Sequence, residues 1–204
     1  MGNVRSAEKA LERVDALVER TSDAARARGA DGLVLPGDGA FPKAMERVRA
    51  LGLDGVLRDE LERGTPVLGI CVGMQLLFDG SVELGGAEGL GLLPGRVEAL
   101  DAPGLKVPHI GWNPVSFTRP ALLTRGLPDP CPFYHVHSFA PVPACAEDVA
   151  GTAVYGTRFV SVVERAHLFG VQFHPEKSGP DGLGMLRNFV AGCRSRALGL
   201  GAAA

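Results

Sequence analysis

The residues best suited to chemistry in this chain are one cysteine and one histidine–carboxylate pair. Cys71 lies in the segment PVLGICVGMQLL at 66–77, where a short apolar run stops and helical spacing begins. Gly69 and Gly73 stand two residues to either side of it. This arrangement predicts a nucleophile elbow, a sharp strand-to-helix turn that exposes a reactive side chain and requires small neighbours.

The expected helix after Cys71 would assist the thiol in two ways. Free N–H groups and the dipole at a helix N-terminus favour negative charge, and therefore the reactive thiolate. The backbone N–H of Val72, the next residue, can donate to an oxyanion that develops on a substrate. Cys131, Cys145 and Cys193 lack such surroundings, so we interpret them as small core residues with reduced thiols.

A matching base follows a second apolar run, LFGVQFHPEK at 168–177. His174 ends this run and Glu176 stands two residues further on, so both project to the same side of an extended segment. The carboxylate would orient the imidazole while its other nitrogen faces the Cys71 thiol. The three residues predict nucleophilic catalysis by a thiol. No metal site is expected, because no other histidine has a cysteine or carboxylate at metal-ligand spacing.

Helical and strand patterns alternate in the first half of the chain. Residues 6–14 and 41–61 have helical spacing, and each is followed by a short apolar run, at 32–35 and 66–70. Such alternation predicts a mostly parallel sheet flanked by helices, because parallel strands need crossover connections. The second half contains β-like runs broken by Gly and Pro, and a closing helix is expected at 181–198. These later strands are expected at 96–100, 113–117, 133–139, 159–164 and 168–173.

Length and composition favour a single domain over 1–204. The residues are 46% hydrophobic and the formal net charge is -2, which leaves no basic stripe for nucleic acid. No apolar run approaches the roughly 20 residues that span a membrane, and no secretory signal is visible, so a cytoplasmic location is expected. The start MGNVRS also fits a myristoylation pattern, but so short a pattern is weak evidence.

These motifs resemble those of the class I glutamine amidotransferases, in which GICxGMQ carries the nucleophile and HPE the other two triad members. A fuller set is similar to the glutaminase subunits of imidazole glycerol phosphate synthases. KVPHIGWN is its most specific member, because the nucleophile and HPE strings occur throughout the class. The set comprises LPGDGAF at 35–41, GICVGMQLLF at 69–78, GLGLLPGRV at 89–97, KVPHIGWN at 106–113, YHVHSF at 134–139 and GVQFHPEKS at 170–178.

The resemblance implies a flavodoxin-like α/β fold, glutamine hydrolysis through a cysteinyl thioester without a cofactor, and a heterodimer with a (β/α)₈ cyclase subunit that receives the ammonia. Carried over by position, Gln75 and Glu83 would hold glutamine. The backbone at Ser138 and Phe139 would bind its α-carboxylate. The residues that would lie toward the cyclase are Gly2, Asn3, Lys106, His109, Trp112, Asn113 and Lys177.

The chain departs from the family pattern at two places. Gly37 and Asp38 fall on the family's oxyanion strand, where the family usually has valine in place of Asp38. A carboxylate there opposes the developing negative charge unless its side chain points away. The family also has a short strand before the Gly-Asn pair that stands here at residues 2 and 3. We therefore expect the first strand to be truncated in this sequence and the native protein to begin upstream of Met1.

Two alternatives stay open from the sequence alone. One is a glutaminase of another pathway, such as pyridoxal phosphate or anthranilate synthesis, against which KVPHIGWN speaks. The other is a catalytically silent binding subunit, suggested by Asp38 and by the truncated strand. Labelling of Cys71 with a glutamine analogue would separate an active glutaminase from a silent subunit.

Overall fold

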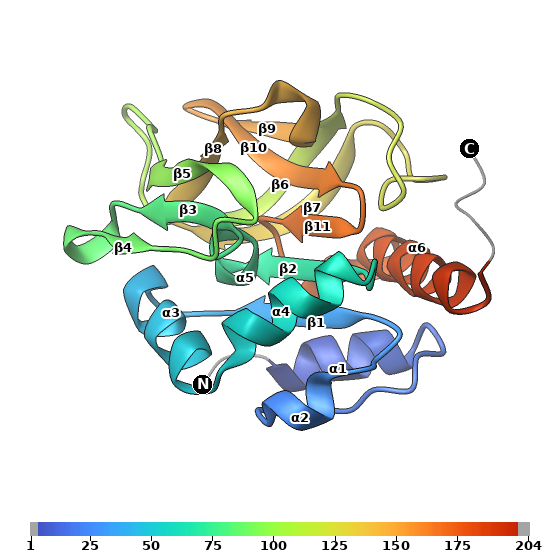
Figure 1. Ribbon diagram of the computed structural model, residues 1–204. Helices are drawn as coiled ribbons and strands as arrows, with labels where there is room; N and C mark the ends of the chain where they lie inside the picture. Colours follow the sequence, from blue (N-terminus) through green and yellow to red (C-terminus); the bar gives the residue numbers. More distant parts are fainter. Residues whose placement is uncertain (1–3, 200–204) are drawn as a thin grey trace.

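The computed structural model describes residues 4–199, which form two sheets with helices packed on them (Figure 1). The smaller, four-stranded sheet has the order β4 (Ala87–Glu88), β3 (Phe78–Ser81), β5 (Leu93–Ala99) and β8 (Phe139–Pro143). The larger, seven-stranded sheet has the order β1 (Leu33–Gly37), β2 (Val67–Cys71), β11 (Leu168–Val171), β10 (Thr157–Arg165), β9 (Val149–Tyr155), β6 (His109–Phe117) and β7 (Cys131–His137).

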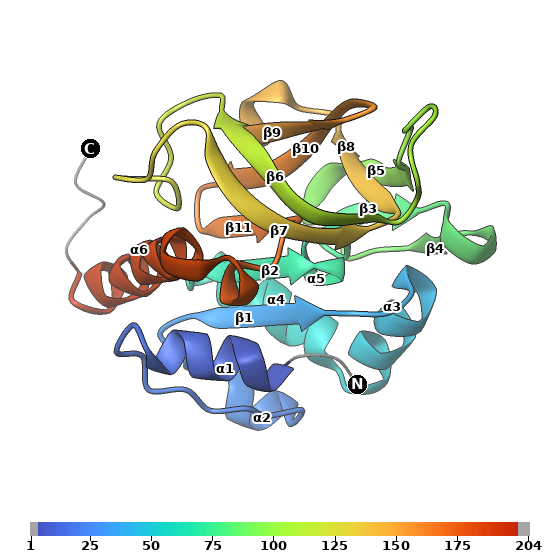
Figure 2. The same ribbon diagram turned by 180° about the vertical axis from the view of Figure 1, so that it is seen from behind.

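The helices cover the end of the larger sheet that contains β1 and β2. α4 lies over one face of these strands in Figure 1, and α1 and α6 lie over the opposite face in Figure 2. The α-helices are α1 (Val4–Glu12), α2 (Ala24–Ala27), α3 (Phe41–Ala50), α4 (Leu53–Glu62), α5 (Val72–Gln75) and α6 (Gly179–Ala197). Three short 3₁₀ helices are η1 (Glu83–Gly85), η2 (Ala146–Asp148) and η3 (Pro175–Lys177).

The α/β class expected from the sequence is confirmed, but the larger sheet is mixed rather than mostly parallel. Parallel pairing in this sheet joins β2 to β1 on one side and to β11 on the other. Strands β10, β9, β6 and β7 pair antiparallel. The reason is the short connections of the second half: only Ala166 and His167 separate β10 from β11, and antiparallel strands alone can be joined by so tight a turn.

Several element boundaries differ from the sequence expectation. The helical stretch at 41–61 is two helices, because Gly52 adopts a left-handed conformation with φ 65° between α3 and α4. The expected strand at 133–139 is divided at Ser138 between β7 and β8. Four strands were not predicted, namely β3, β4, β8 and β9.

Strand β2 lies in the buried interior of the larger sheet. Every residue of β2 is buried, because β1 and β11 flank its edges and helices cover its faces. Strand β1, by contrast, forms the edge of the sheet and all five of its residues are half-buried. Within residues 4–199, the chain before β1 forms α1 and α2 and no strand. The cysteine at the end of β2 is therefore supported from both sides.

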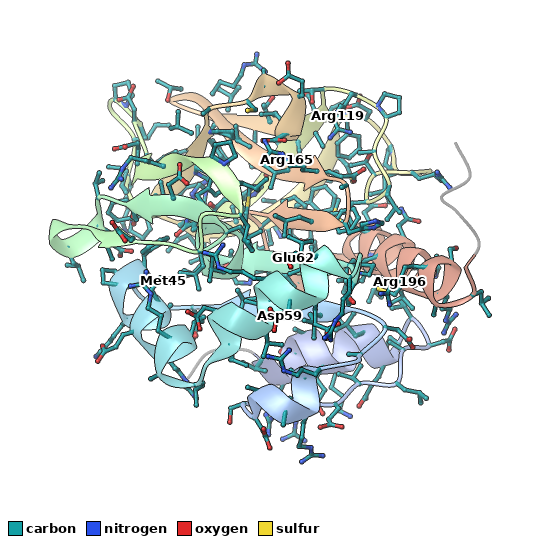
Figure 3. All side chains as sticks on the ribbon, viewed as in Figure 1. Met45, Asp59, Glu62, Arg119, Arg165 and Arg196 are labelled. Atoms are coloured by element: carbon teal, nitrogen blue, oxygen red, sulfur yellow. The ribbon has the colours of Figure 1, made fainter. Side chains whose placement is uncertain are left out.

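Two arginines form contacts that stabilise the antiparallel half of the larger sheet. Arg165 forms a paired contact with the buried Asp148, at 2.7 Å from Nε to Oδ1 and 2.6 Å from Nη2 to Oδ2. Arg119 donates to the carbonyl oxygens of Glu147 and Glu164. Both arginines are labelled on the β-rich side of the molecule in Figure 3. Such planar, multiple contacts hold η2 against the end of β10.

Over residues 4–199, no helix has the length and apolar character to cross a membrane.

Candidate active site

Cys71 stands at a strained turn between β2 and α5. Its backbone angles are φ 55° and ψ −116°, a conformation that residues with side chains rarely adopt. A Cβ added at Gly69 would lie 2.6 Å from the Gly73 carbonyl oxygen, and one at Gly73 would collide with the carbonyl oxygen of Leu35. The elbow predicted from the sequence is therefore present, with glycine required on both sides.

The helix after the elbow is shorter than the sequence indicated. α5 comprises only the four residues Val72–Gln75, and the chain then continues into β3. A single turn aligns few peptide dipoles, so the expected helix-dipole effect on Cys71 is small. The backbone N–H of Val72 remains next to the thiol as a local donor. Other groups must therefore provide most of the polar contacts of the Cys71 sulfur.

His174 and Glu176 form a tightly coupled pair beside Cys71. His174 follows β11, which is paired in register with β2, so the ends of both strands meet. Its Nδ1 lies 2.8 Å from Glu176 Oε1, and both side chains are largely buried. The other ring nitrogen, Nε2, is left free to interact with the Cys71 thiol. Burial acts to lower the pKa of His174, but the hydrogen bonds and charges of Cys71 and Glu176 outweigh it and raise the pKa to about 9.

Two further groups surround the Cys71 sulfur. The carbonyl oxygen of Val136 lies 3.7 Å from Sγ, and Nε2 of Gln172 lies 3.8 Å from it. Gln172 is fully buried and was not singled out from the sequence. A signal was available, because Gln172 is a polar residue inside an otherwise buried run before His174, and a buried amide needs specific partners.

The expected glutamine-binding residues are held by contacts within the protein. Gln75 donates from Nε2 to the carbonyl oxygen of Phe139 at 3.0 Å, so these two expected site residues are neighbours. Ser138 lies at the turn directly before Phe139. Glu83 accepts from the backbone N–H of Phe41 at 2.8 Å, which caps the N-terminus of α3. Their roles toward glutamine remain predictions.

The end of β1 lies directly beside the nucleophile. Gly37 is paired with Cys71 in the sheet register, and a Cβ at Gly37 would collide with the backbone nitrogen of Gly73. Asp38 follows and is exposed. A solvated carboxylate repels a nearby oxyanion much less than a buried one. The Asp38 side chain therefore does not by itself exclude an oxyanion hole at this turn.

A cavity lies behind the triad. Oε2 of Glu176 is buried and, within residues 4–199, has no hydrogen-bond partner. A donor that enters the cavity would satisfy this oxygen. The lining residues are Val4, Ala7, Pro36, Gly37, Asp38, Ile70, His174 and Glu176.

The expected partner-facing residues divide into exposed and buried groups. On β6, His109 and Asn113 are buried, whereas Ile110 and Trp112 are 59% and 57% exposed. Side chains alternate between the faces of a strand, so the first two point inward. The side chains of His109 and Asn113 are therefore not part of the exposed face of β6, and their expected role toward a partner remains a prediction. The exposed Ile110 was not singled out from the sequence. Lys106 and Lys177 are exposed, whereas Gly2 and Asn3 lie outside the described residues.

The exposed Ile110, Trp112 and Lys177, together with the half-buried Tyr134, are here called the β6 surface. Trp112 is paired with Tyr134 across β6 and β7, with ring centroids 6.2 Å apart. Lys177 Nζ lies 6.0 Å from the Tyr134 ring centroid. Exposed aromatic and basic side chains in one place are typical of a protein interface.

Three buried histidines form a neutral network under the β6 surface. His109 Nδ1 lies 3.0 Å from His137 Nε2, and His137 Nδ1 lies 3.0 Å from the Phe139 carbonyl oxygen. His135 contacts Ser161 Oγ through Nε2 at 2.9 Å. Burial lowers the pKa of all three histidines, that of His137 to about 4. No group of metal-ligating side chains occurs in the described part of the chain.

The low pKa values of the buried histidines predict that the free energy of unfolding falls at acid pH. An unfolded histidine is protonated near pH 6.5 but folded His137 only near pH 4, so unfolding takes up protons in between and the free energy of unfolding falls as the pH drops. The full difference for His137 corresponds to roughly 3 kcal/mol. His174 acts in the opposite sense: its stabilising contribution is complete below pH 6.5 and is lost as the pH rises through about 9.

Urea unfolding between pH 4.5 and about 9 would measure both effects. His137→Gln should reduce the loss of stability between neutral and acid pH, whereas His167→Gln, which changes an exposed histidine, should leave it unchanged. An acid loss of equal size in wild type and His137→Gln would contradict the assignment to His137.

The comparisons with known proteins agree with this geometry. Residues 3–193 match the family model described as glutamine amidotransferase class-I. The imidazole glycerol phosphate synthase subunit HisH of Moorella thermoacetica is 51% identical over 189 residues, covering 93% of this chain and 90% of the relative. That of Salinibacter ruber is 49% identical over 197 residues, covering 94% and 90%.

Solved structures show the same fold at low sequence identity. The structure described as a glutamine amidotransferase superposes with a TM-score of 0.73 at 21% identity, covering 95% of each chain. The glutaminase domain of Trypanosoma brucei CTPS with bound acivicin gives a TM-score of 0.68 at 18% identity, covering 94% and 88%. The chain thus belongs to the class I glutamine amidotransferases and, within them, to the HisH family.

Proposed function

We propose that this chain is the glutaminase subunit of an imidazole glycerol phosphate synthase. The observation that carries the proposal is Cys71 in a strained elbow beside His174, whose Nδ1 is held by Glu176. A nucleophile, a base and an orienting carboxylate in this order are what acyl transfer from a carboxamide requires. The similarity to HisH subunits over nearly the whole chain supports the pathway.

The reaction follows from the geometry. The Cys71 thiolate attacks the side-chain carbonyl carbon of glutamine, and the carbonyl oxygen becomes an oxyanion beside the Val72 N–H and the end of β1. When the C–N bond breaks, protonated His174 gives its proton to the leaving nitrogen, and ammonia and a γ-glutamyl thioester result. His174 then takes a proton from water, which attacks the thioester to give glutamate and to free the thiolate.

The substrate-binding roles extend this proposal to the neighbouring residues. Gln75 and Glu83 would hold glutamine, and the backbone at Ser138 and Phe139 would bind its α-carboxylate. The contact between Gln75 and Phe139 supports this, because it places both beside the Cys71 network. Gly37 would contribute to the oxyanion hole, since its register position adjoins Cys71.

The partner would be a cyclase subunit that docks on the β6 surface, with Lys106 at its margin. The ammonia would join a phosphoribulosyl aminoimidazole intermediate there and give imidazole glycerol phosphate and aminoimidazole carboxamide ribotide, in histidine biosynthesis. We further propose that residues 1–204 act as one domain in the cytoplasm. The four free cysteines support a reducing compartment.

Glutamine hydrolysis by the isolated chain is expected to be slow and to rise about 10²- to 10³-fold when the cyclase binds with its phosphoribosyl ligand. Removing one hydrogen-bond donor from an oxyanion hole usually changes the rate by about this factor. The segment 37–39 offers such a donor, because glycine flanks Asp38 on both sides and a peptide flip there is sterically easy. Steady-state glutaminase kinetics with and without the liganded cyclase would measure the ratio. Equal rates in both states would refute the coupling.

Three variants sharpen this test. Trp112→Ala should raise the cyclase concentration needed for half-maximal activation, because it removes an exposed aromatic residue from the β6 surface. Leu17→Ala, which removes a fully exposed apolar residue in the connection between α1 and α2, should not. If Asp38→Val leaves the activation ratio unchanged, the switch does not depend on that side chain.

A further inference from the structure

We propose that Gln172 is a positioning residue for the Cys71 thiolate and that Gln75 fixes the orientation of the Gln172 amide. This inference rests on the proposed function only in taking Cys71 as the nucleophile. It adds a fourth side chain, Gln172, to the triad of Cys71, His174 and Glu176. It also gives Gln75 a role that does not require contact with glutamine.

The contacts determine which end of each amide faces which neighbour. The Phe139 carbonyl oxygen can only accept, so the Gln75 group at 3.0 Å from it must be the NH₂. The same nitrogen lies 3.1 Å from the Gln172 amide, which must therefore present its oxygen. The NH₂ of Gln172 is left to face Cys71 Sγ at 3.8 Å. The orientation is thus fixed by a main-chain carbonyl, which cannot flip independently.

The Phe139 carbonyl is itself held in place. His137 is neutral near pH 7, since burial lowers its pKa to about 4, and its Nδ1–H donates to the same oxygen. His137 in turn accepts from His109 through Nε2. The anchor of the amide pair therefore belongs to the buried histidine network and not to a mobile surface group.

The two polar neighbours of the sulfur have opposite effects on its charge. The Val136 carbonyl oxygen accepts from a protonated thiol, but its partial negative charge repels a thiolate. The N–H of Gln172 donates to sulfur and so favours the thiolate. Gln172 is completely buried, so water cannot take its place. Gln172 thus offsets the repulsion between the Val136 carbonyl oxygen and the thiolate, and holds the sulfur on the side away from Val136.

The pH dependence of Cys71 alkylation tests this proposal without glutamine. The folded full-length chain is treated with iodoacetamide across a pH range, and labelling of the Cys71 peptide is followed by mass spectrometry. Gln172→Glu keeps the shape but turns a carboxylate oxygen toward the sulfur. It should move the alkylation midpoint up by about one pH unit or more. Gln172→Met, which removes the donor without adding charge, should move it by less in the same direction.

Two comparisons separate positioning from a general loss of packing. Gln75→Met should also raise the alkylation midpoint, because the Gln172 amide is then free to rotate. Asn188→Asp makes the same kind of amide-to-acid change at a side chain that donates to the carbonyl oxygens of Leu123 and Arg125, and it should leave the midpoint unchanged. Alkylation profiles of folded Gln172→Glu and Gln172→Met that coincide with wild type would overturn the proposal. Loss of glutaminase activity alone would not, since alkylation reports on the thiol itself.

Discussion

Cys71→Ala is expected to lower glutamine hydrolysis by roughly 10⁴-fold or more, because no other group in the site can form the thioester. The substitution removes one sulfur at the end of β2 and leaves the flanking glycines and the sheet pairing intact, so the fold should persist. Ammonia supplied directly should still support the synthase reaction of the complex. Glutaminase assay and ammonia-dependent synthase assay on the same complex would separate the two outcomes.

A matched control is available among the other cysteines. Cys193 is buried on α6, and burial raises the pKa of its thiol to about 12, so it remains protonated and unreactive. Cys193→Ala should therefore keep glutaminase activity within a few-fold of wild type. A Cys71→Ala protein with near-wild-type glutaminase activity would rule out the triad. Loss of the ammonia-dependent reaction as well would point to a damaged complex instead.

Gly73→Ala is expected to destabilise the protein by about 3 kcal/mol, the upper end of the range typical when a core is overpacked and backbone is forced to shift. The added methyl group would collide with the Leu35 carbonyl oxygen on β1. This obstacle is backbone, so it cannot move aside as a flexible side chain would. The free energy of unfolding in urea measures the effect, and glutaminase activity should fall with it because Cys71 shares the turn.

Gly55→Ala provides the comparison for this change. Gly55 lies inside α4, and a Cβ there meets nothing within 4 Å. Alanine should therefore be neutral or stabilise the helix by up to about 1 kcal/mol. A Gly73→Ala protein as stable as Gly55→Ala would mean that the elbow can accommodate a side chain.

Local sequence patterns predicted the features that depend on local chemistry. Glycine spacing around Cys71 predicted the elbow because the close approach of backbone at Gly69 and Gly73 leaves no other choice. His174 and Glu176 were predicted to share a side and are in contact at 2.8 Å. The segment that joins them is the 3₁₀ helix η3 and not the extended backbone that was expected. The break at Gly52 was missed, because apolar spacing continues from α3 into α4 and only the backbone angle separates them.

Features that depend on strand register could not be predicted in the same way. The contact between His109 and His137 exists because β6 and β7 pair with these residues opposite each other, and no local pattern encodes that register. Gln172 reaches Gln75 only because β11 lies next to β2. The burial of His109 and Asn113 likewise follows from which face of β6 is covered.

The pairing of β2 with its two neighbours sets the order in which the site would be lost on partial unfolding. Cys71 is the last residue of β2 and His174 comes shortly after β11, and these two strands pair in the protected interior. The amides of both residues are therefore expected to be among the slowest to exchange with solvent. The end of β1 carries Gly37 and lies at the sheet edge, where half-buried residues open at lower free energy. Local opening would therefore remove the proposed oxyanion segment first and leave Cys71 and His174 in place without it.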